Sequence, residues 1–274
     1  MRTNVPLKKS LSQHFLADLS VAARMVESMA IDHDDRILEI GPGDGRLTEW
    51  LLRSSAGTVL AVELDKRFSS HLLNRFGNDD RFHLIQNDFL KIELTEWARD
   101  KKLRIVGNLP YAITSPILFR MLENRSEVSD ATVTVQKEVA ERVTSPPGSK
   151  AYGIPSVFFQ LYAQTKILFG VPRNAFHPVP NVDSAVLKID FLSEPAYTVR
   201  RPDLFQKVVK TAFGQRRKML RNTLKPLLRD ESIWNESPVD LSKRPEQLTV
   251  WEFVRLTDFI SGLPSSASSQ PWPS

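Results

Sequence analysis

The sequence predicts an α/β protein: a mainly parallel sheet with a terminal antiparallel hairpin, followed by a small all-α domain. Two observations support this prediction. Short apolar runs alternate with helical segments over roughly the first 190 residues, and only helical segments follow. Strands that alternate with helices form parallel sheets covered on both faces, and such sheets bind ligands at the carboxyl ends of their strands.

The expected elements follow one another in a regular order. Five apolar runs predict strands, at residues 36–40, 58–64, 82–88, 103–108 and 131–138. Helical segments are expected at residues 20–31, 46–54, 65–76, 115–123 and 137–143. Two further apolar runs, at residues 167–172 and 185–192, predict the strands of the terminal hairpin.

The pattern changes near residue 195, which divides the chain into three expected parts. Residues 1–194 form the sheet domain, and residues 195–262 form a basic helical domain with helices at 203–224 and 249–260. Residues 263–274 are rich in Pro and Ser and predict a disordered tail.

Composition excludes several classes of protein. Of the 274 residues, 41% are hydrophobic and 25% are charged, as expected of a globular protein with a packed core. There is no cysteine, which excludes disulfides and thiolate metal sites. No apolar run approaches the roughly 18 residues of a membrane span, and the N-terminus lacks the apolar core of a secretory signal. These features predict a cytoplasmic protein with no membrane partner.

Positive charge is concentrated in one segment. The net charge is +5, yet residues 200–229 contain ten Lys or Arg against one acid, Asp203, so the rest of the chain sums to minus four. This asymmetry favours a polyanionic partner such as nucleic acid over a merely solvated helix face. Five apolar residues of the same segment share one face of a helical projection: Val209, Phe213, Leu220, Leu224 and Leu227. That face predicts core packing along a helix which Pro226 ends or kinks.

A glycine-rich turn, "EIGPGDGRLT", follows the first strand and opens a helix. Gly41, Gly43 and Gly45 lack side chains, which lets a ligand approach the backbone closely. The spacing differs from the G-x-G-x-x-G that binds a pyrophosphate, and Glu39 just before the turn disfavours a phosphate. By itself, a structural turn would explain the pattern about as well.

Acidic residues end the next two strands. Glu63 follows the second strand, where a carboxylate can accept hydrogen bonds from both ribose hydroxyls of an adenosine ligand. Asp88 follows the third, where it could accept from an adenine amine with Phe89 beside the ring. Each acid alone could be a solvated strand terminus, but three successive strand ends of this kind favour a nucleoside site.

The fourth strand ends in "NLPY" on the same predicted edge. The Asn108 side chain and the Leu109 carbonyl, which precedes Pro110, offer two acceptors for an amino group, and Tyr111 can stack on a base. This arrangement suits methyl transfer from a sulfonium to an amino nitrogen, since such a transfer requires alignment more than a strong base.

These motifs together resemble a known family. "EIGPGDG", "VELD", "QNDFL" and "NLPY", in this order, are similar to class I S-adenosylmethionine methyltransferases that act on amino nitrogen. From "KKSLSQHFL" to "VWEFVRLTDFI" the chain resembles the ribosomal RNA adenine N6,N6-dimethyltransferase family. Three further stretches, at residues 146–153, 176–187 and 213–224, support the resemblance, and the last two point to the small-subunit branch.

The resemblance implies a Rossmann-like methyltransferase domain, S-adenosylmethionine as cofactor and a basic RNA-binding domain. The expected reaction is dimethylation of N6 of two adjacent adenosines in a hairpin loop near the 3′ end of small-subunit rRNA. The expected partner is a pre-assembled 30S particle, and the expected oligomeric state is a monomer. His71 and His177 lack partners at metal-ligand spacing, so no metal is expected.

The resemblance also assigns roles to single residues. The expected cofactor-binding residues are His14, Leu16, Gly41, Gly43, Glu63, Asp88, Phe89 and Asn108. The expected catalytic residues are Asn108, Leu109, Pro110, Tyr111 and Phe176, with Phe176 stacking on the target adenine opposite Tyr111. The expected RNA-binding residues are Lys150, Arg216, Arg217, Lys218 and Arg221. Without the resemblance, His14 would be interpreted as a surface histidine and Phe176 as a core residue.

Some residues depart from the family pattern, and other functions remain open. Ser12 replaces a glycine before "QHFL", Ile154-Pro155 replace Arg-Leu, and Asn181 replaces a lysine. One alternative is dimethylation of large-subunit rRNA, as in the macrolide-resistance branch. Another is a non-catalytic RNA-binding assembly factor. Methylation of DNA or of a protein glutamine is disfavoured, because such enzymes usually have a second proline in place of Leu109.

Overall fold

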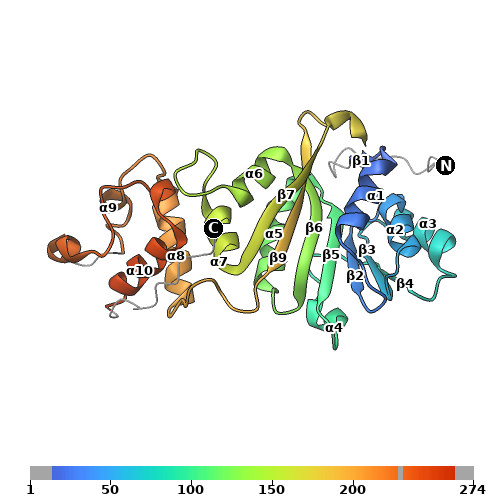
Figure 1. Ribbon diagram of the computed structural model, residues 1–274, viewed down its shortest axis with the longest axis horizontal. Coiled ribbons are helices and arrows are strands. Elements are labelled where there is room, and N and C mark those ends of the chain that lie inside the picture. Colours follow the sequence, from blue (N-terminus) through green and yellow to red (C-terminus); the bar gives the residue numbers. More distant parts are fainter. Residues whose placement is uncertain (1–13, 228–230, 263–274) are drawn as a thin grey trace. The chain divides into compact units, whose positions relative to one another are not determined.

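The computed structural model describes residues 14–227 and 231–262, so Ser12 and the predicted tail at 263–274 lie outside the described residues. Figure 1 shows the elements in sequence colours. The chain forms two compact units, one that runs to Ala140 and resumes at Lys166–Phe191, and one of Glu141–Thr165 and the chain from Leu192 onward. Within the described ranges, no helix is long and apolar enough to cross a membrane.

A seven-stranded sheet with the order β4-β3-β2-β5-β6-β9-β7 dominates the first unit. The strands are β2 (Arg36–Ile40), β3 (Thr58–Val62), β4 (Phe82–Ile85), β5 (Leu103–Asn108), β6 (Val128–Gln136), β7 (Ala163–Val171) and β9 (Ser184–Phe191). The pairs from β4 through β6 are parallel, whereas β9 is antiparallel to β6, with β7 beside β9. The predicted mainly parallel sheet and the pairing of its last two strands are confirmed.

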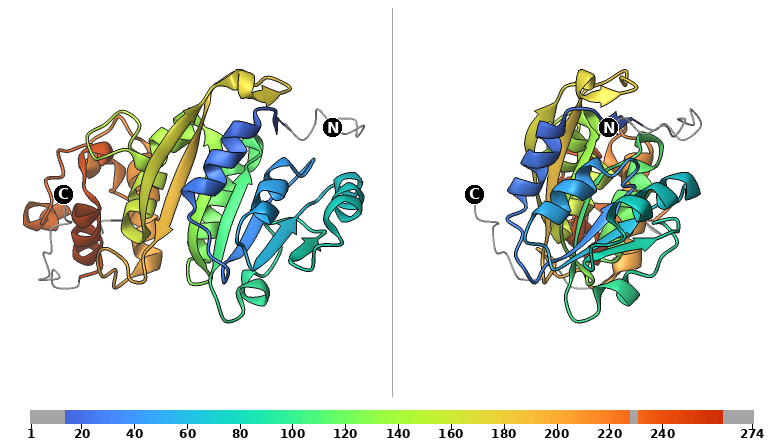
Figure 2. Two further views of the ribbon diagram at one scale, coloured as in Figure 1. Left: turned by 45° about the vertical axis from the view of Figure 1, so that its right-hand side comes forward. Right: turned by 90° about the vertical axis from the view of Figure 1, so that its right-hand side faces the viewer.

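Helices cover both faces of this sheet. The helices of the first unit are α1 (Leu19–Ser28), α2 (Arg46–Arg53), α3 (Lys66–Phe76), α4 (Leu94–Ala98) and α5 (Thr114–Glu123), with the 3-10 turn η2 (Tyr111–Ile113). Helix α6 (Lys137–Thr144) begins in this unit and continues into the second. Ile37 and Leu38 are both fully buried, and neighbouring strand residues point to opposite faces, so neither face is open. Met25 of α1, Leu51 of α2 and Ile37 belong to one core cluster. The left view of Figure 2 shows α1, in dark blue, crossing in front of the strands.

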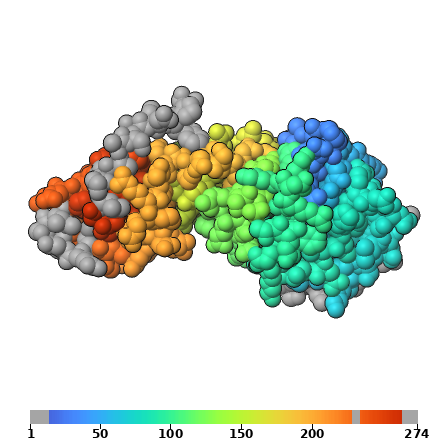
Figure 3. Space-filling model, turned by 90° about the horizontal axis from the view of Figure 1, so that it is seen from below, coloured from blue at the N-terminus to red at the C-terminus, as the bar shows by residue number. Residues whose placement is uncertain are grey.

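A two-stranded ribbon lies at the end of the sheet where the parallel strands finish. In it β1 (Phe15–Leu16) pairs antiparallel with β8 (Phe176–His177), and the amides of Ala17 and Asp18 both donate to the Ala175 carbonyl. Figure 1 places β1 at the upper edge of the unit and α4 at the lower edge. Figure 3 views the molecule from below and thus shows the surface on the side of α4, away from β1. The sequence prediction missed this ribbon, because two residues are too few for a strand periodicity.

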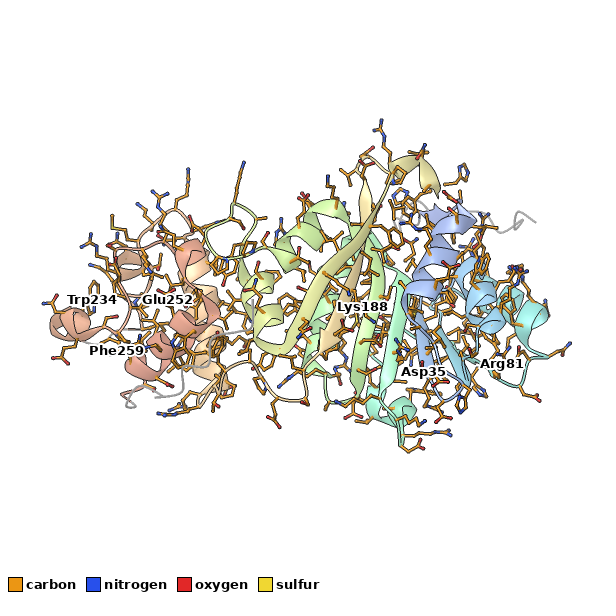
Figure 4. All side chains as sticks on the ribbon, viewed as in Figure 1. Asp35, Arg81, Lys188, Trp234, Glu252 and Phe259 are labelled. Atoms are coloured by element: carbon orange, nitrogen blue, oxygen red, sulfur yellow. The ribbon has the colours of Figure 1, made fainter. Side chains whose placement is uncertain are left out.

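A buried ionic cluster ties β5, β6 and β9 together. Arg104 donates to Asp130 at 2.9 Å and to Asp35 at 2.6 Å, and Lys188 also pairs with Asp130. Figure 4 labels Lys188, which lies on β9, and Asp35, which directly precedes β2. Burial by itself raises the pKa of Asp130, but hydrogen bonds from Arg104 and the charge of Lys188 outweigh it and lower the pKa below its ordinary value. The carboxylate therefore stays ionised and holds the three strands in register.

The second unit is helical, as the sequence predicts, but it begins elsewhere. Its elements are α7 (Ile154–Tyr162), α8 (Pro202–Gly214), α9 (Leu220–Thr223) and α10 (Val250–Ile260), with the 3-10 turns η4 (Glu231–Glu236) and η5 (Pro245–Gln247). Residues 141–165, expected in the first domain, belong to this unit. Helix α7 was not predicted; it begins beside Pro155, and Phe158 packs edge-on against Phe205 of α8 at 5.8 Å between ring centroids.

The prediction of one long helix over residues 203–224 is wrong. Helix α8 ends at Gly214, and the chain is extended at Met219 before α9 begins. Gly is about 1 kcal/mol less favourable than Ala inside a helix. Beyond the break, the amides of Leu220 and Arg221 donate to carbonyls of Lys243 and Leu241, which takes the place of helical hydrogen bonds. Of the predicted apolar face, Val209 and Phe213 therefore lie on α8 and Leu220 on α9, whereas Leu224 and Leu227 come after α9.

Candidate active site

A cavity of about 230 Å³ lies at the carboxyl ends of β2, β3 and β5 and in the segment after β4. Residues of each of the four segments line it: Ile40, Gly41, Gly43, Val62, Glu63, Asp88, Phe89, Asn108 and Tyr111. His14 and Phe15 of the N-terminal segment complete the wall. The predicted convergence of the glycine turn, the two acids and "NLPY" is thus confirmed.

The glycine turn opens one wall of the cavity. Gly41 and Gly43 have φ angles of +64° and +54°, which favour glycine. A Cβ on Gly43 would lie 2.5 Å from Cε1 of Phe15, whereas a Cβ on Gly41 would meet nothing within 4 Å. A side chain at Gly43 would therefore be strained by its left-handed φ and would displace the Phe15 ring, whereas Gly41 leaves its backbone open to a ligand.

Glu63 connects this turn to the end of β3. Only 6% of Glu63 is exposed, and its two carboxylate oxygens accept from the amides of Asp65 at 2.8 Å and Gly43 at 3.1 Å. A carboxylate has about four acceptor positions, so two remain for donors of a ligand. Burial raises the pKa of this carboxyl, while the two amide hydrogen bonds oppose the rise. The geometry fits a pair of ribose hydroxyls.

Glu39, one residue before the end of β2, is a second buried acid beneath the turn. It is 1% exposed, and Thr48 Oγ1 donates to its Oε2 at 2.6 Å. Burial raises the pKa of Glu39 to about 8, and the nearby carboxylates of Glu63 and Asp44 contribute to the rise. Glu39 is therefore largely protonated at neutral pH, a state that the sequence did not indicate.

Asp88 and Phe89 line the cavity from the segment after β4. Strand β4 ends at Ile85, so Asp88 lies in the following turn rather than at the strand end itself. Its Oδ1 accepts from the Leu90 amide at 3.0 Å, which fixes the carboxylate. Phe89 is 5% exposed and forms part of the apolar wall.

Asn108 is the last residue of β5, and its side chain is anchored. The Nδ2 group donates to the carbonyl of His14 at 2.6 Å, so Oδ1 remains as an acceptor. The amide of Leu109 donates to Thr134, and the carbonyl of Pro110 accepts from Thr114 and from the amide of Ile113. These bonds fix the turn that presents the side chain of Asn108 and the carbonyl of Leu109.

Tyr111 stands beside the same turn with its ring half-buried. Its hydroxyl shares a hydrogen bond of 2.6 Å with Ser184 Oγ, and the His14 ring lies 5.3 Å away between centroids. Burial raises the pKa of the phenol, which is therefore neutral. The His14 ring is itself held by a 2.7 Å hydrogen bond between its Nδ1 and the Pro178 carbonyl.

Two expected site residues do not reach the cavity. Phe176 is 1% exposed and belongs to the core cluster, so in this arrangement it cannot stack on a base. Leu16 is 6% exposed and joins the same cluster, while its neighbour Phe15 lines the cavity instead. The burial of Phe176 could have been predicted from the general tendency of phenylalanine to lie in the core.

The expected RNA-binding residues all lie in the second unit. Lys150, Arg217, Lys218 and Arg221 are exposed. Arg216 is only partly exposed, and its Nη2 donates to the carbonyls of Lys150 at 2.5 Å and Ser149 at 3.3 Å. Arg216 therefore holds the loop that carries Lys150. Among the residues with described positions, no group of three His, Cys, Asp or Glu could hold a metal ion.

The fold and the cavity define a class of enzyme. The protein is a class I S-adenosylmethionine-dependent methyltransferase. Its sheet is parallel except for an antiparallel last pair, and it has a glycine turn after β2, an acidic residue after β3 and an amide side chain at the end of β5. The residues fit this cofactor: Gly41 leaves space along its backbone, and Glu63 retains acceptor positions.

Comparison with known proteins identifies the family. The family model for "Ribosomal RNA adenine dimethylase" matches residues 4–261, and the chain belongs to this family. The Ribosomal RNA small subunit methyltransferase A of Pseudomonas aeruginosa is 42% identical over 260 residues, which cover 94% of this chain and 96% of that protein. The expected resemblance is confirmed, and the chain is an S-adenosylmethionine-dependent rRNA adenine dimethyltransferase.

Two solved structures share the fold. A dimethyladenosine transferase from Plasmodium falciparum has a TM-score of 0.76 at 22% identity, covering 91% of this chain and 99% of that one. The 23S rRNA methyltransferase ErmE has a TM-score of 0.68 at 25% identity, covering 90% of this chain and 99% of that one. The fold therefore extends through both units.

Proposed function

We propose that this enzyme adds two methyl groups to N6 of each of two adjacent adenosines in a hairpin loop near the 3′ end of small-subunit rRNA. The observation that carries the proposal is the anchored amide of Asn108 at the cavity. The choice of the small subunit is supported by 42% identity to a small-subunit methyltransferase A, against 25% to the 23S rRNA methyltransferase ErmE.

Some residues around the cavity bind the cofactor, and others bind the target base. S-adenosylmethionine supplies an electrophilic methyl group on its sulfonium. Glu63 accepts from the ribose hydroxyls, Asp88 accepts from the adenine amine, and Gly41 leaves the backbone open to the methionine part. These contacts hold the cofactor at the ends of β2 to β4, beside Asn108.

The turn after β5 holds the target amino group. Asn108 Oδ1 and the Leu109 carbonyl accept its two hydrogens, which directs the nitrogen lone pair toward the methyl carbon. Tyr111 stacks on the base, with its ring fixed by the hydrogen bond to Ser184. The target adenine leaves its stack to reach this turn, as base-modifying enzymes require. Methyl transfer leaves a positive charge on N6, which then loses a proton to water, because the amide oxygens that hold the amino group are too weakly basic to keep it.

Replacing Asn108 tests the gripping role. Asn108→Ala removes the acceptor but leaves Glu63, Asp88 and Gly41 in place, so methylation should be lost while S-adenosylmethionine binding, measured by calorimetry, persists. Undiminished turnover in this variant would reject the role of Asn108. Loss of cofactor binding in this variant would reject the proposal that separate residues bind the cofactor and the target base.

Mass spectrometry of rRNA tests the substrate. Small-subunit rRNA from cells that lack this protein should be missing two dimethyladenosines, and returning the wild-type gene should restore both. Loss of a dimethyladenosine from large-subunit rRNA instead would support the alternative branch. Failure of the protein to bind S-adenosylmethionine, measured by calorimetry, would support a non-catalytic assembly factor.

We further propose that the enzyme acts as a monomer on a pre-assembled 30S particle, with Lys150, Arg217, Lys218 and Arg221 contacting phosphates. The exposed positions of these cations in the second unit support this proposal. The rate of methylation of 30S particles should greatly exceed the rate of methylation of protein-free rRNA. Equal rates would contradict the proposal that the substrate is a pre-assembled particle. We also expect the enzyme to act in the cytoplasm, because its substrate is rRNA.

A further inference from the structure

Strand β1 lies between the glycine turn and Asn108. On one side, Nη1 of Arg46 donates to the carbonyls of Leu16 at 3.1 Å and Ala17 at 3.2 Å. On the other side, the carbonyl of His14 accepts from Asn108 Nδ2 at 2.6 Å. A segment of four residues thus joins the start of α2 to the residue that grips the amino group.

Arg46 is placed for this contact at some local cost. It is the first residue of α2, where the helix dipole disfavours a cation by about 0.3–1 kcal/mol. Its Nε donates to Asp44 Oδ2 at 2.7 Å, and only 26% of the Arg46 side chain and 10% of the Asp44 side chain are exposed. Asp44 therefore orients the guanidinium so that Nη1 faces the carbonyls of the N-terminal segment.

The position of His14 decides the orientation of the Asn108 amide. With Nδ2 donating to the His14 carbonyl, Oδ1 is left as the acceptor. A flipped amide would place two carbonyl oxygens 2.6 Å apart, which is repulsive. If β1 moved away, Asn108 would lose the contact that distinguishes the two orientations.

We propose that Arg46 is a positioning residue for methyl transfer. By holding the carbonyls of Leu16 and Ala17 it keeps β1 in place, and β1 keeps the amide of Asn108 turned so that it accepts the target amino group. This inference rests on the gripping role of Asn108 proposed above. A misplacement of about 1 Å at a reacting centre can cost on the order of a hundredfold in rate.

The test compares Arg46→Met with Arg53→Met on the same helix. Arg53 donates to Glu49 within α2 and has an exposed side chain, so it serves as a matched control. In Arg46→Met, kcat with saturating S-adenosylmethionine and rRNA should fall by about tenfold or more. The dissociation constant of S-adenosylmethionine should change less than kcat, because the hydrogen bonds of Arg46 go to Asp44, Leu16 and Ala17 and not to Glu63 or Asp88.

Amide hydrogen exchange separates positioning from general stability. The amides of Ala17 and Asp18 donate to the Ala175 carbonyl, so loosening β1 should speed their exchange in Arg46→Met but not in Arg53→Met. An unchanged kcat, or a lowered kcat with unchanged exchange at these amides, would overturn the inference. If Arg46→Met does not fold, Arg46→Lys takes its place; it keeps a charge beside Asp44 but has only one amino group for the two carbonyls, and the same outcomes apply.

The outcomes also distinguish this inference from the proposed function. If the wild-type enzyme methylates small-subunit rRNA and Arg46→Met does so equally well, only the inference fails. If the wild-type enzyme produces no dimethyladenosine in small-subunit rRNA, the proposed function fails, and kcat is then measured on the rRNA that the enzyme does modify.

Discussion

Replacing Glu39 with Gln should remove a pH-dependent loss of stability. Glu39 is 1% exposed, and burial raises its pKa from the ordinary 4.5 to about 8. Between these two values the folded protein holds a proton on Glu39 that the unfolded chain has released. The free energy of unfolding of the wild type therefore falls as the pH rises through this window, by about 1.4 kcal/mol for each pH unit from this group alone.

The magnitude follows from the same two pKa values. From the fully protonated to the fully ionised limit, the buried carboxyl costs about 5 kcal/mol. Gln has nearly the shape of a protonated Glu, and its side-chain carbonyl can still accept from Thr48 Oγ1. Glu39→Gln should thus match the wild type near pH 5 and exceed it increasingly toward pH 8.

The assay is urea unfolding of both proteins from pH 5.5 to 7.5. Over these two pH units the difference in the free energy of unfolding should grow by roughly 2–3 kcal/mol, since groups shared by the two proteins largely cancel. Glu27→Gln, at an exposed position on α1, is the matched control and should show a flat difference. A difference between Glu39→Gln and the wild type that stays constant with pH would refute the reasoning.

Three further predictions follow from other contacts. Gly43→Ala should destabilise the protein by about 1–2 kcal/mol from its left-handed φ alone, and by more because its Cβ would lie 2.5 Å from the Phe15 ring; thermal unfolding should show it, and a wild-type Tm would contradict it. Arg104→Met removes one partner of the buried carboxylate of Asp130 and should lower the free energy of unfolding, measured in urea, by about 3 kcal/mol. A decrease of less than about 1 kcal/mol would contradict this prediction. Arg217→Met should reduce the slope of log affinity for rRNA against log salt by about 1, whereas an unchanged slope would remove this residue from the interface.

Much of the site could be predicted from the sequence because its residues follow buried strands directly. The apolar runs of β2 and β5 are bounded by turn residues, so both strands were predicted with the ends that the structure has. Since parallel strands end at one edge of a sheet, Glu63 and Asn108 were expected to meet there. The class of enzyme also followed, because the glycine turn, the acids and "NLPY" are local in sequence.

What the sequence left open depends on contacts between distant residues. The ribbon of β1 and β8 joins segments about 160 residues apart, and it is this pairing that buries Phe176 and places Phe15 against Gly43. Likewise, residues 141–165 join the helical unit, and the break after Gly214 is stabilised by carbonyls near residue 242. Periodicity reports whether a residue is buried but not which partner buries it, so only the tertiary structure decided these positions and the hydrogen bond that orients Asn108.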